Sequence, residues 1–129
     1  MRTAARLFDE LCESAPARVL LHGDLHHHKV LRAVRRPWLA IDPHGHVGDP
    51  GFDLGCLLYN PDPGDTEPDV VALLPGRLGQ LTAGAGQPRE RVVGWGFVMA
   101  VLSEVWTCED GGEPSGKPLA VAEALEPLL

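Results

Sequence analysis

The sequence lacks most features that mark secreted, membrane-spanning or nucleic-acid-binding proteins. It has no apolar run close to the roughly 18 residues of a transmembrane helix and no secretory signal at its N-terminus. Basic residues are outnumbered by acidic ones, and the net charge of −7 argues against nucleic acid or an anionic membrane as a partner. Its three cysteines are odd in number, far apart and without C-x-x-C spacing, which favours buried thiols in a reducing compartment. We therefore expect a cytoplasmic protein.

The composition is that of an ordinary globular domain. Apolar residues make up 44% and charged residues 22% of the chain, close to the average for folded proteins. A chain of 129 residues is long enough for one domain with a buried core. No internal repeat is visible, so we expect a single domain over residues 1–129.

Hydrophobic periodicity predicts a mainly helical chain with a few short strands. A central helix is expected over residues 89–108, where apolar residues form a broad face along about five turns. Pro75 and two glycines predict a broken or kinked helix over residues 70–81. The other expected elements are helices at 3–13, 52–59 and 119–129, strands at 18–22, 30–34 and 38–41, and a loop at 60–69.

The stretch "VLLHGDLHHHKVL", residues 19–31, concentrates the polar chemistry of the chain between two apolar runs. His22 and His26 have the spacing of two zinc ligands on one helix face, but Gly23 and Asp24 follow a strand, so helical spacing has little meaning there. The tract can also be plain loop polarity. A third interpretation depends on the residues downstream.

Those residues are "WLAIDPHGHVGDPGFDLG" at 38–55 and "GWGFVMAVLSEVWTCEDGG" at 94–112. Together with "LLHGDLHH" at 20–27, their order and spacing resemble the catalytic half of the aminoglycoside phosphotransferases, which have a protein-kinase-like fold. Within that superfamily the chain is most similar to the streptomycin 6-kinase and hydroxyurea phosphotransferase family. The strong resemblance covers residues 18–60, and a weaker one extends through the long helix.

The resemblance implies roles for individual side chains. Asp24 would be the catalytic base, on a loop that lets it face the acceptor hydroxyl. Asp42, at the end of a strand, would hold magnesium against the phosphates of ATP, and His22 would support the catalytic loop. Asp53 would tie down that loop, and Asp49 is assigned to capping of the helix that follows it.

Two departures from the family pattern stand out. The family has an asparagine, the second magnesium ligand, five residues after the base, where this chain has Lys29. An ammonium cannot ligate a metal. Kinase-like phosphotransferases also need a first lobe with a glycine-rich loop and a phosphate-pairing lysine, for which residues 1–17 have no room. The sequence therefore resembles a C-terminal lobe alone, with the N-terminal ATP-binding lobe absent, as in a truncated product, a fragment or a mis-assigned start.

We accordingly predict an α+β fold, a protein-kinase-like C-terminal lobe that is mainly helical with a short β-hairpin carrying the catalytic loop. The implied activity is ATP- and Mg2+-dependent phosphorylation of an alcohol group on an aminoglycoside-like or hydroxyurea-like acceptor, with the isolated chain inactive. One alternative is a non-catalytic remnant lobe that binds a small molecule or a partner. Another is a histidine-ligated metal hydrolase. The face that would meet the first lobe should be apolar and promote self-association.

A hairpin over residues 30–41 also predicts a contact. With its turn at Arg35 and Arg36, the pairing register places Lys29 opposite Asp42. The ammonium would then pair with the carboxylate and oppose the entry of magnesium.

Overall fold

The computed structural model describes residues 1–61 and 69–129, and within them it confirms a mainly helical α+β fold. The expected loop at 60–69 falls mostly outside the described residues. The helices are α1 (Arg2–Glu13), α2 (Gly51–Tyr59), α3 (Val70–Ala85), α4 (Arg89–Glu109) and α5 (Lys117–Leu125), with short 3-10 turns η1 (His27–Lys29) and η2 (Glu126–Leu128). The strands are β1 (Val19–Leu20), β2 (Val30–Arg32), β3 (Trp38–Ala40) and β4 (Val47–Gly48).

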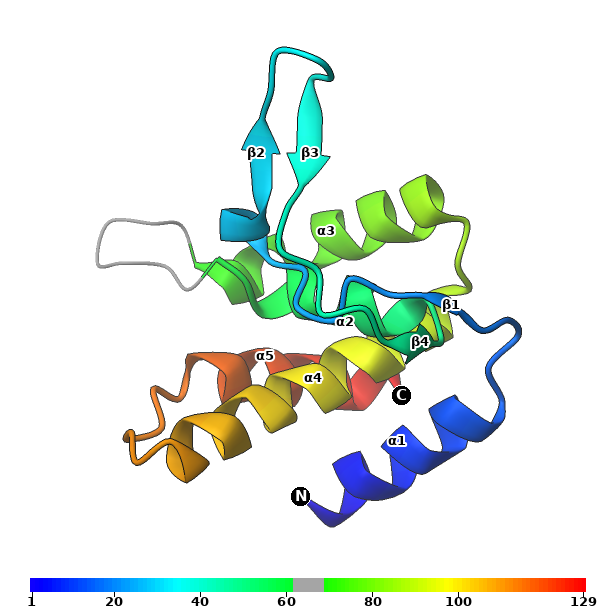
Figure 1. Cartoon of the computed structure of the whole chain (residues 1–129). Coiled ribbons are helices and arrows are strands. Elements are labelled where there is room, and N and C mark those ends of the chain that lie inside the picture. The colour runs from blue at the N-terminus through cyan, green and yellow to red at the C-terminus, as the bar shows by residue number, and fades with distance from the viewer. Residues whose placement is uncertain (62–68) are drawn as a thin grey trace.

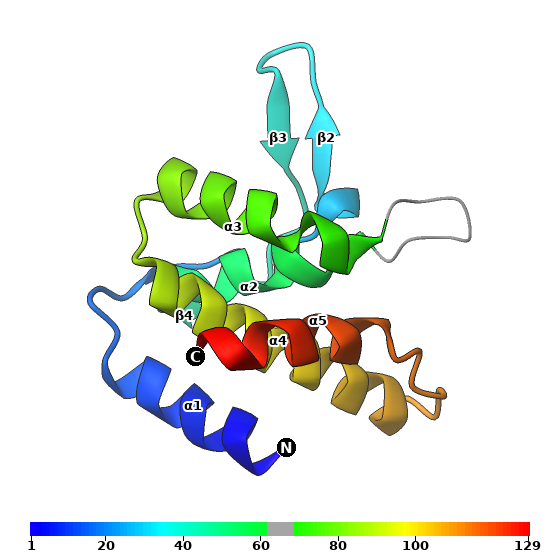
Figure 2. The same ribbon diagram turned by 180° about the vertical axis from the view of Figure 1, so that it is seen from behind.

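Helix α4 is the centre of the core, as its broad apolar face predicts. It packs against α1, α2, α3 and α5, and Figures 1 and 2 show it running between α1 on one side and α2 on the other. Val92, Trp95 and Met99 on this helix are among the largest fully buried side chains. The β2–β3 hairpin projects away from this helical body (Figure 1).

Glycines allow α2 and α4 to approach closely. A Cβ on Gly55 would lie 2.6 Å from the backbone oxygen of Trp95, and one on Gly51 would lie 2.2 Å from Cδ1 of the same residue. Contacts this short are essentially never made by real Cβ atoms. The start of α2 can therefore pack this closely against α4 only because Gly51 and Gly55 have no side chain. Helix α2 also carries Asp53, which lies next to the histidine-rich loop.

The two small sheets are both antiparallel pairs. β2 pairs with β3 as the expected hairpin, but the register differs by one residue from the expectation, because Val30 lies opposite Ala40. Lys29 is consequently opposite Ile41, whose N–H donates to the Lys29 carbonyl at 2.9 Å. β1 pairs with β4, a two-residue strand that hydrophobic periodicity did not predict.

A buried ion pair joins three separate parts of the chain. Arg91 of α4 donates from Nε to Oδ2 of Asp49 at 3.1 Å, and its Nη2 also contacts that oxygen. The same Nη2 donates to the Leu11 carbonyl at 2.8 Å, and Nη1 donates to Ser14 Oγ at 3.0 Å. The hydrogen bonds of Arg91 thus connect the start of α4 to the end of α1 and to the segment before α2.

Three other expectations are corrected or qualified. The expected break at Pro75 does not occur, because α3 is one helix whose Leu74 and Leu78 are buried in the core. The cysteines are free, yet only Cys56 is buried, whereas Cys12 is half-buried and Cys108 is exposed near the end of α4. The last helix begins earlier than expected, at Lys117.

Helix α4 also bears on the question of a membrane. Among the residues the structure describes, it is the one helix long and apolar enough to cross a bilayer by length and composition. However, 56% of its most apolar 18-residue window is buried inside the protein. The core helix of a soluble domain gives the same result, so the feature is weak support for a membrane span.

Candidate active site

The loop between β1 and η1 is held in place by Asp53, in the first turn of α2. The backbone N–H of His22 donates to Asp53 Oδ2 at 2.7 Å, and that of Gly23 donates to Oδ1 at 2.9 Å. A carboxylate that accepts two neighbouring amides fixes both the position and the orientation of the loop. Asp24 is the next residue, so Asp53 fixes the backbone that leads directly into it.

Gly23 is required by the shape of this turn. Its φ is +84°, in the left-handed region that disfavours residues with a Cβ. A Cβ there would also lie 2.5 Å from Cδ2 of His46, on the segment between β3 and β4. The positive φ is therefore the main reason for a glycine in the HGD motif, and the His46 ring would also have to shift to admit a Cβ.

The imidazole of His22 links this loop to the end of the hairpin. Its Nε2 lies 2.7 Å from the carbonyl oxygen of Ile41, and its Nδ1 lies 3.3 Å from the backbone nitrogen of Asp24. The Ile41 oxygen can only accept and the Asp24 N–H can only donate. A neutral ring protonated on Nε2 satisfies both, with Nδ1 as the acceptor. His22 thus positions both Asp24 and the residue before Asp42.

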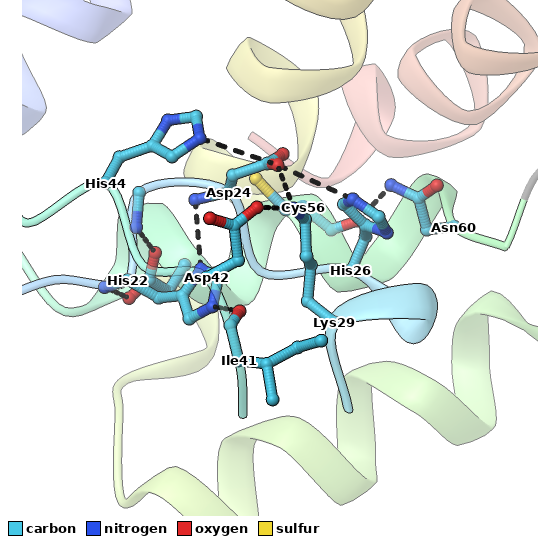
Figure 3. Close-up of polar contacts among 11 residues, drawn as sticks. His22, Asp24, His26, Lys29, Ile41, Asp42, His44, Cys56 and Asn60 are labelled. Carbon is cyan, nitrogen blue, oxygen red and sulfur yellow. Dashed lines mark hydrogen bonds and ion pairs between the residues drawn. The ribbon is translucent and has the colours of Figure 1, made fainter. Parts of the chain in front are cut away.

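The Asp24 carboxylate is surrounded by cationic or potentially cationic groups (Figure 3). Its Oδ2 lies 3.6 Å from His26 Nε2, 3.8 Å from Lys29 Nζ and 3.9 Å from His44 Nε2. The side chain remains 39% exposed, so a ligand can reach it. The arrangement provides an accessible carboxylate with nearby groups that can balance its charge.

Asp42 lies on the other side of Lys29. The ammonium contacts Asp42 Oδ2 directly while staying within 4 Å of Asp24, so one cation bridges two carboxylates. The hydrogen bond with Asp42 raises the pKa of Lys29, with burial opposing and the charges of Asp42 and Asp24 adding to it. The same hydrogen bond, followed by the Lys29 charge, lowers the pKa of Asp42.

The contact expected between Lys29 and Asp42 therefore forms, although the register that predicts it is wrong. Asp42 has a φ of +57°, the only positive value among the described residues other than glycine. Aspartate tolerates this left-handed conformation better than most side chains. Because the chain turns here immediately after β3, the carboxylate reaches Lys29 without being directly opposite it.

The remaining assigned residue, Asp49, lies apart from this cluster. Its Oδ1 accepts from the Gly51 N–H at 2.7 Å at the start of α2, and its Oδ2 pairs with Arg91. Its contacts support the start of the helix that carries Asp53. Within residues 1–61 and 69–129 no group of three or more histidine, cysteine or carboxylate side chains is placed to hold a metal ion.

Sequence reasoning missed two residues that contribute to this region. His44 donates its backbone N–H to the His22 carbonyl at 2.7 Å and presents its ring to Asp24. The sequence signal that could have indicated His44 is its position two residues after Asp42. Arg91, which fixes Asp49, is one of two arginines at the start of α4, and no local pattern distinguishes it from Arg89.

Comparison with known proteins agrees with the resemblance of the motifs. Residues 1–111 match the family model described as aminoglycoside/hydroxyurea antibiotic resistance kinase. The chain is 40% identical over 111 residues to a streptomycin 6-kinase of Streptomyces glaucescens, covering 83% of this chain and 36% of that protein. It is 43% identical over 103 residues to a streptomycin 3''-kinase of Klebsiella pneumoniae, covering 76% and 38% respectively.

A hydroxyurea phosphotransferase of Kitasatospora aureofaciens is 40% identical over 111 residues, which cover 85% of this chain and 31% of that protein. The matched segment therefore spans only 31 to 38% of the length of these relatives. No solved structure matches it significantly. The family model covers most of the chain, and the chain belongs to the aminoglycoside/hydroxyurea antibiotic resistance kinase family.

Proposed function

We propose that this chain forms the acceptor-side half of a phosphotransferase that moves the γ-phosphoryl group of ATP to a hydroxyl of a small antibiotic. Asp24 would be the catalytic base. The observation that supports this role is the way the loop is built, since Asp53 fixes the two preceding amides and His22 fixes the Asp24 N–H. The carboxylate that follows these fixed amides is 39% exposed and lies within 4 Å of three groups that can carry positive charge.

In the proposed reaction the acceptor oxygen attacks the γ-phosphorus and its proton passes to Asp24. The bond between that phosphorus and the β,γ-bridging oxygen breaks, and ADP leaves with the electron pair. His22 would act as a positioning residue, because its two ring contacts set the path of the loop on either side of Asp24. Asp53 would act in the same way through the backbone.

The acceptor is proposed from the relatives and from charge. The family match over residues 1–111 includes the loop, and the similar proteins are streptomycin kinases and a hydroxyurea phosphotransferase. The net charge of −7 is compatible with a cationic acceptor such as an aminoglycoside. We propose streptomycin-like compounds as the first acceptors to test, with hydroxyurea as the second.

A segment exchange tests this function. The matching segment of the Streptomyces glaucescens kinase is replaced by this chain carrying Lys29→Asn, and transfer of labelled phosphate from ATP to streptomycin and to hydroxyurea is measured. We expect transfer that falls by about a hundred-fold or more in the Asp24→Asn version, as for the loss of a general base. A folded chimera whose transfer is unchanged by Asp24→Asn would refute the role of Asp24.

A second candidate function is a non-catalytic lobe that retains only ligand binding. It is favoured by Lys29, whose ammonium stands between the two carboxylates that the family resemblance assigns to chemistry. For this candidate, the purified chain should bind streptomycin in calorimetry without turning over ATP. On either proposal we expect the purified chain alone to show no phosphorylation above an Asp24→Ala control.

A further inference from the structure

The cluster formed by Asp24, Asp42 and Lys29 does not have the composition of a divalent metal site. Magnesium requires six oxygen ligands in near-octahedral geometry, some of them from water. Here the side chain that reaches both carboxylates ends in an ammonium, which has three donors and no acceptor. The residues present therefore do not fit the metal that the family resemblance implies.

We propose that the ammonium of Lys29 is the resident cation of the carboxylate pair formed by Asp24 and Asp42, and that it keeps this pair from binding a divalent metal ion. The inference rests on the proposed function only in taking these two carboxylates to be the reactive ones. The contacts themselves are independent of any activity.

The backbone of Lys29 is held by hydrogen bonds on both sides, unlike that of a freely moving surface lysine. Its N–H donates to the His26 carbonyl at 2.9 Å, and its carbonyl accepts from Ile41 at 2.9 Å, so both sides of its backbone are engaged. It lies at the junction of η1 and β2, where the hairpin leaves the body of the protein. The side chain is 19% exposed, so much of its length is covered by its neighbours.

Asp42 contributes the second half of the arrangement. Its left-handed backbone turns the carboxylate toward Lys29, as Figure 3 shows. Oδ2 of each carboxylate faces the same nitrogen, at 3.8 Å for Asp24 and in direct contact for Asp42. A divalent ion bound between these two oxygens would share its position with a unit positive charge and be repelled by it.

The proposal is tested by metal binding to the full chain, measured with Mn2+ by calorimetry and by electron paramagnetic resonance of the free ion. Lys29→Met removes the charge without adding a ligand, and Lys29→Asn removes it and adds an amide oxygen. Arg35→Asn, at the exposed hairpin turn, makes the same change in net charge away from Asp24 and Asp42 and serves as the control. Circular dichroism checks folding, and Lys29→Ala replaces Lys29→Met if the latter does not fold.

We expect both Lys29 variants to bind Mn2+ at least about ten-fold more tightly than the unmodified chain, with no change in Arg35→Asn. Adding Asp42→Asn to Lys29→Asn should abolish the gain. Unchanged affinity in both Lys29 variants would overturn the proposal. A gain in Lys29→Asn alone would also overturn it, because the missing amide ligand would then be the limitation.

These outcomes are separable from those of the segment exchange. Tighter Mn2+ binding with no phosphoryl transfer in the chimera would uphold the resident cation and reject the proposed function. Phosphoryl transfer in the chimera with unchanged Mn2+ affinity in the Lys29 variants would uphold the proposed function and reject the resident cation.

Discussion

The carboxylate of Asp49 is completely buried and is neutralised by Arg91, forty-two positions further along the chain. This pair holds the start of α2 against α4, and α2 in turn carries Asp53, which fixes the candidate loop. The geometry of Asp24 thus depends on an ion pair at the N-terminal end of α2.

Asp49→Ala should lower the free energy of unfolding by about 3 to 5 kcal/mol, because it leaves the Arg91 guanidinium without its partner in a mostly buried position. Urea denaturation followed by circular dichroism measures the change. The control is Arg6→Ala, which breaks an exposed pair with Glu10 and should change stability by less than about 1 kcal/mol. Similar losses in the two variants would contradict the structural role of Asp49.

Asp53→Ala should loosen the loop that precedes Asp24. The amides of His22 and Gly23 lose their carboxylate acceptor, so both should exchange with solvent faster in hydrogen-exchange NMR. We expect a destabilisation of about 1.5 to 3 kcal/mol, as for hydrogen bonds to a charged group. Asp9→Asn, on the exposed side of α1, should leave the exchange of these amides as it was.

Two glycine-to-alanine substitutions should have opposite effects. Gly55→Ala forces a Cβ against the Trp95 backbone and should destabilise the protein by about 1 to 3 kcal/mol. Gly79→Ala, inside α3 with nothing within 4 Å of the added atom, should stabilise it by about 0.5 to 1 kcal/mol. Thermal unfolding distinguishes them, and a neutral Gly55→Ala would show that α2 and α4 are not closely packed.

The three thiols should react in a fixed order. Burial raises the pKa of Cys56 to about 12, so its reactive thiolate is scarce below that pH, whereas Cys108 is exposed. With iodoacetamide at pH 8 we expect Cys108 to be modified first, Cys12 more slowly and Cys56 only after unfolding. Peptide mass spectrometry gives the order, and early modification of Cys56 would contradict its burial.

The same raised pKa makes stability depend on alkaline pH. An unfolded Cys56 would lose its proton near its ordinary value of 9.0, while the folded one keeps it. The contribution of Cys56 to the free energy of unfolding is therefore constant below that pH and falls as the pH rises from there toward 12. A Cys56→Ala variant should show a weaker decline over this range.

We propose that the chain self-associates through its small sheets. Leu20 is 77% exposed and Val47 is 70% exposed on the β1–β4 pair, and Trp38 is 60% exposed on the hairpin. Sedimentation velocity should show concentration-dependent association that is reduced by combining Leu20→Lys with Val47→Lys. A monodisperse monomer at all concentrations would contradict the proposal.

The helical elements were predictable from sequence because their signals are local. The spacing of Leu7, Phe8 and Leu11 indicated α1, and the long apolar face indicated α4 as the central helix. Pro75 was misleading because its neighbours Leu74 and Leu78 are buried, and tertiary packing outweighs the lost hydrogen bond.

What the sequence could not supply are contacts between distant segments. Arg91 and Asp49, the β1–β4 pairing and the Glu104 carboxylate that accepts from the Ser115 and Gly116 amides all depend on the finished fold. The Lys29–Asp42 contact was predicted from the wrong register, and it forms because of one left-handed residue that the register argument did not include.

A cation that is part of the chain differs from one taken from solution. The Lys29 ammonium is covalently tethered beside its carboxylates, so its local concentration is set by chain geometry and does not vary with the supply of metal. Chelators such as EDTA, which dismantle loops organised around bound ions, should therefore leave this loop in place. The charge of the two carboxylates is balanced by the chain itself and does not depend on the concentration of metal ions in solution.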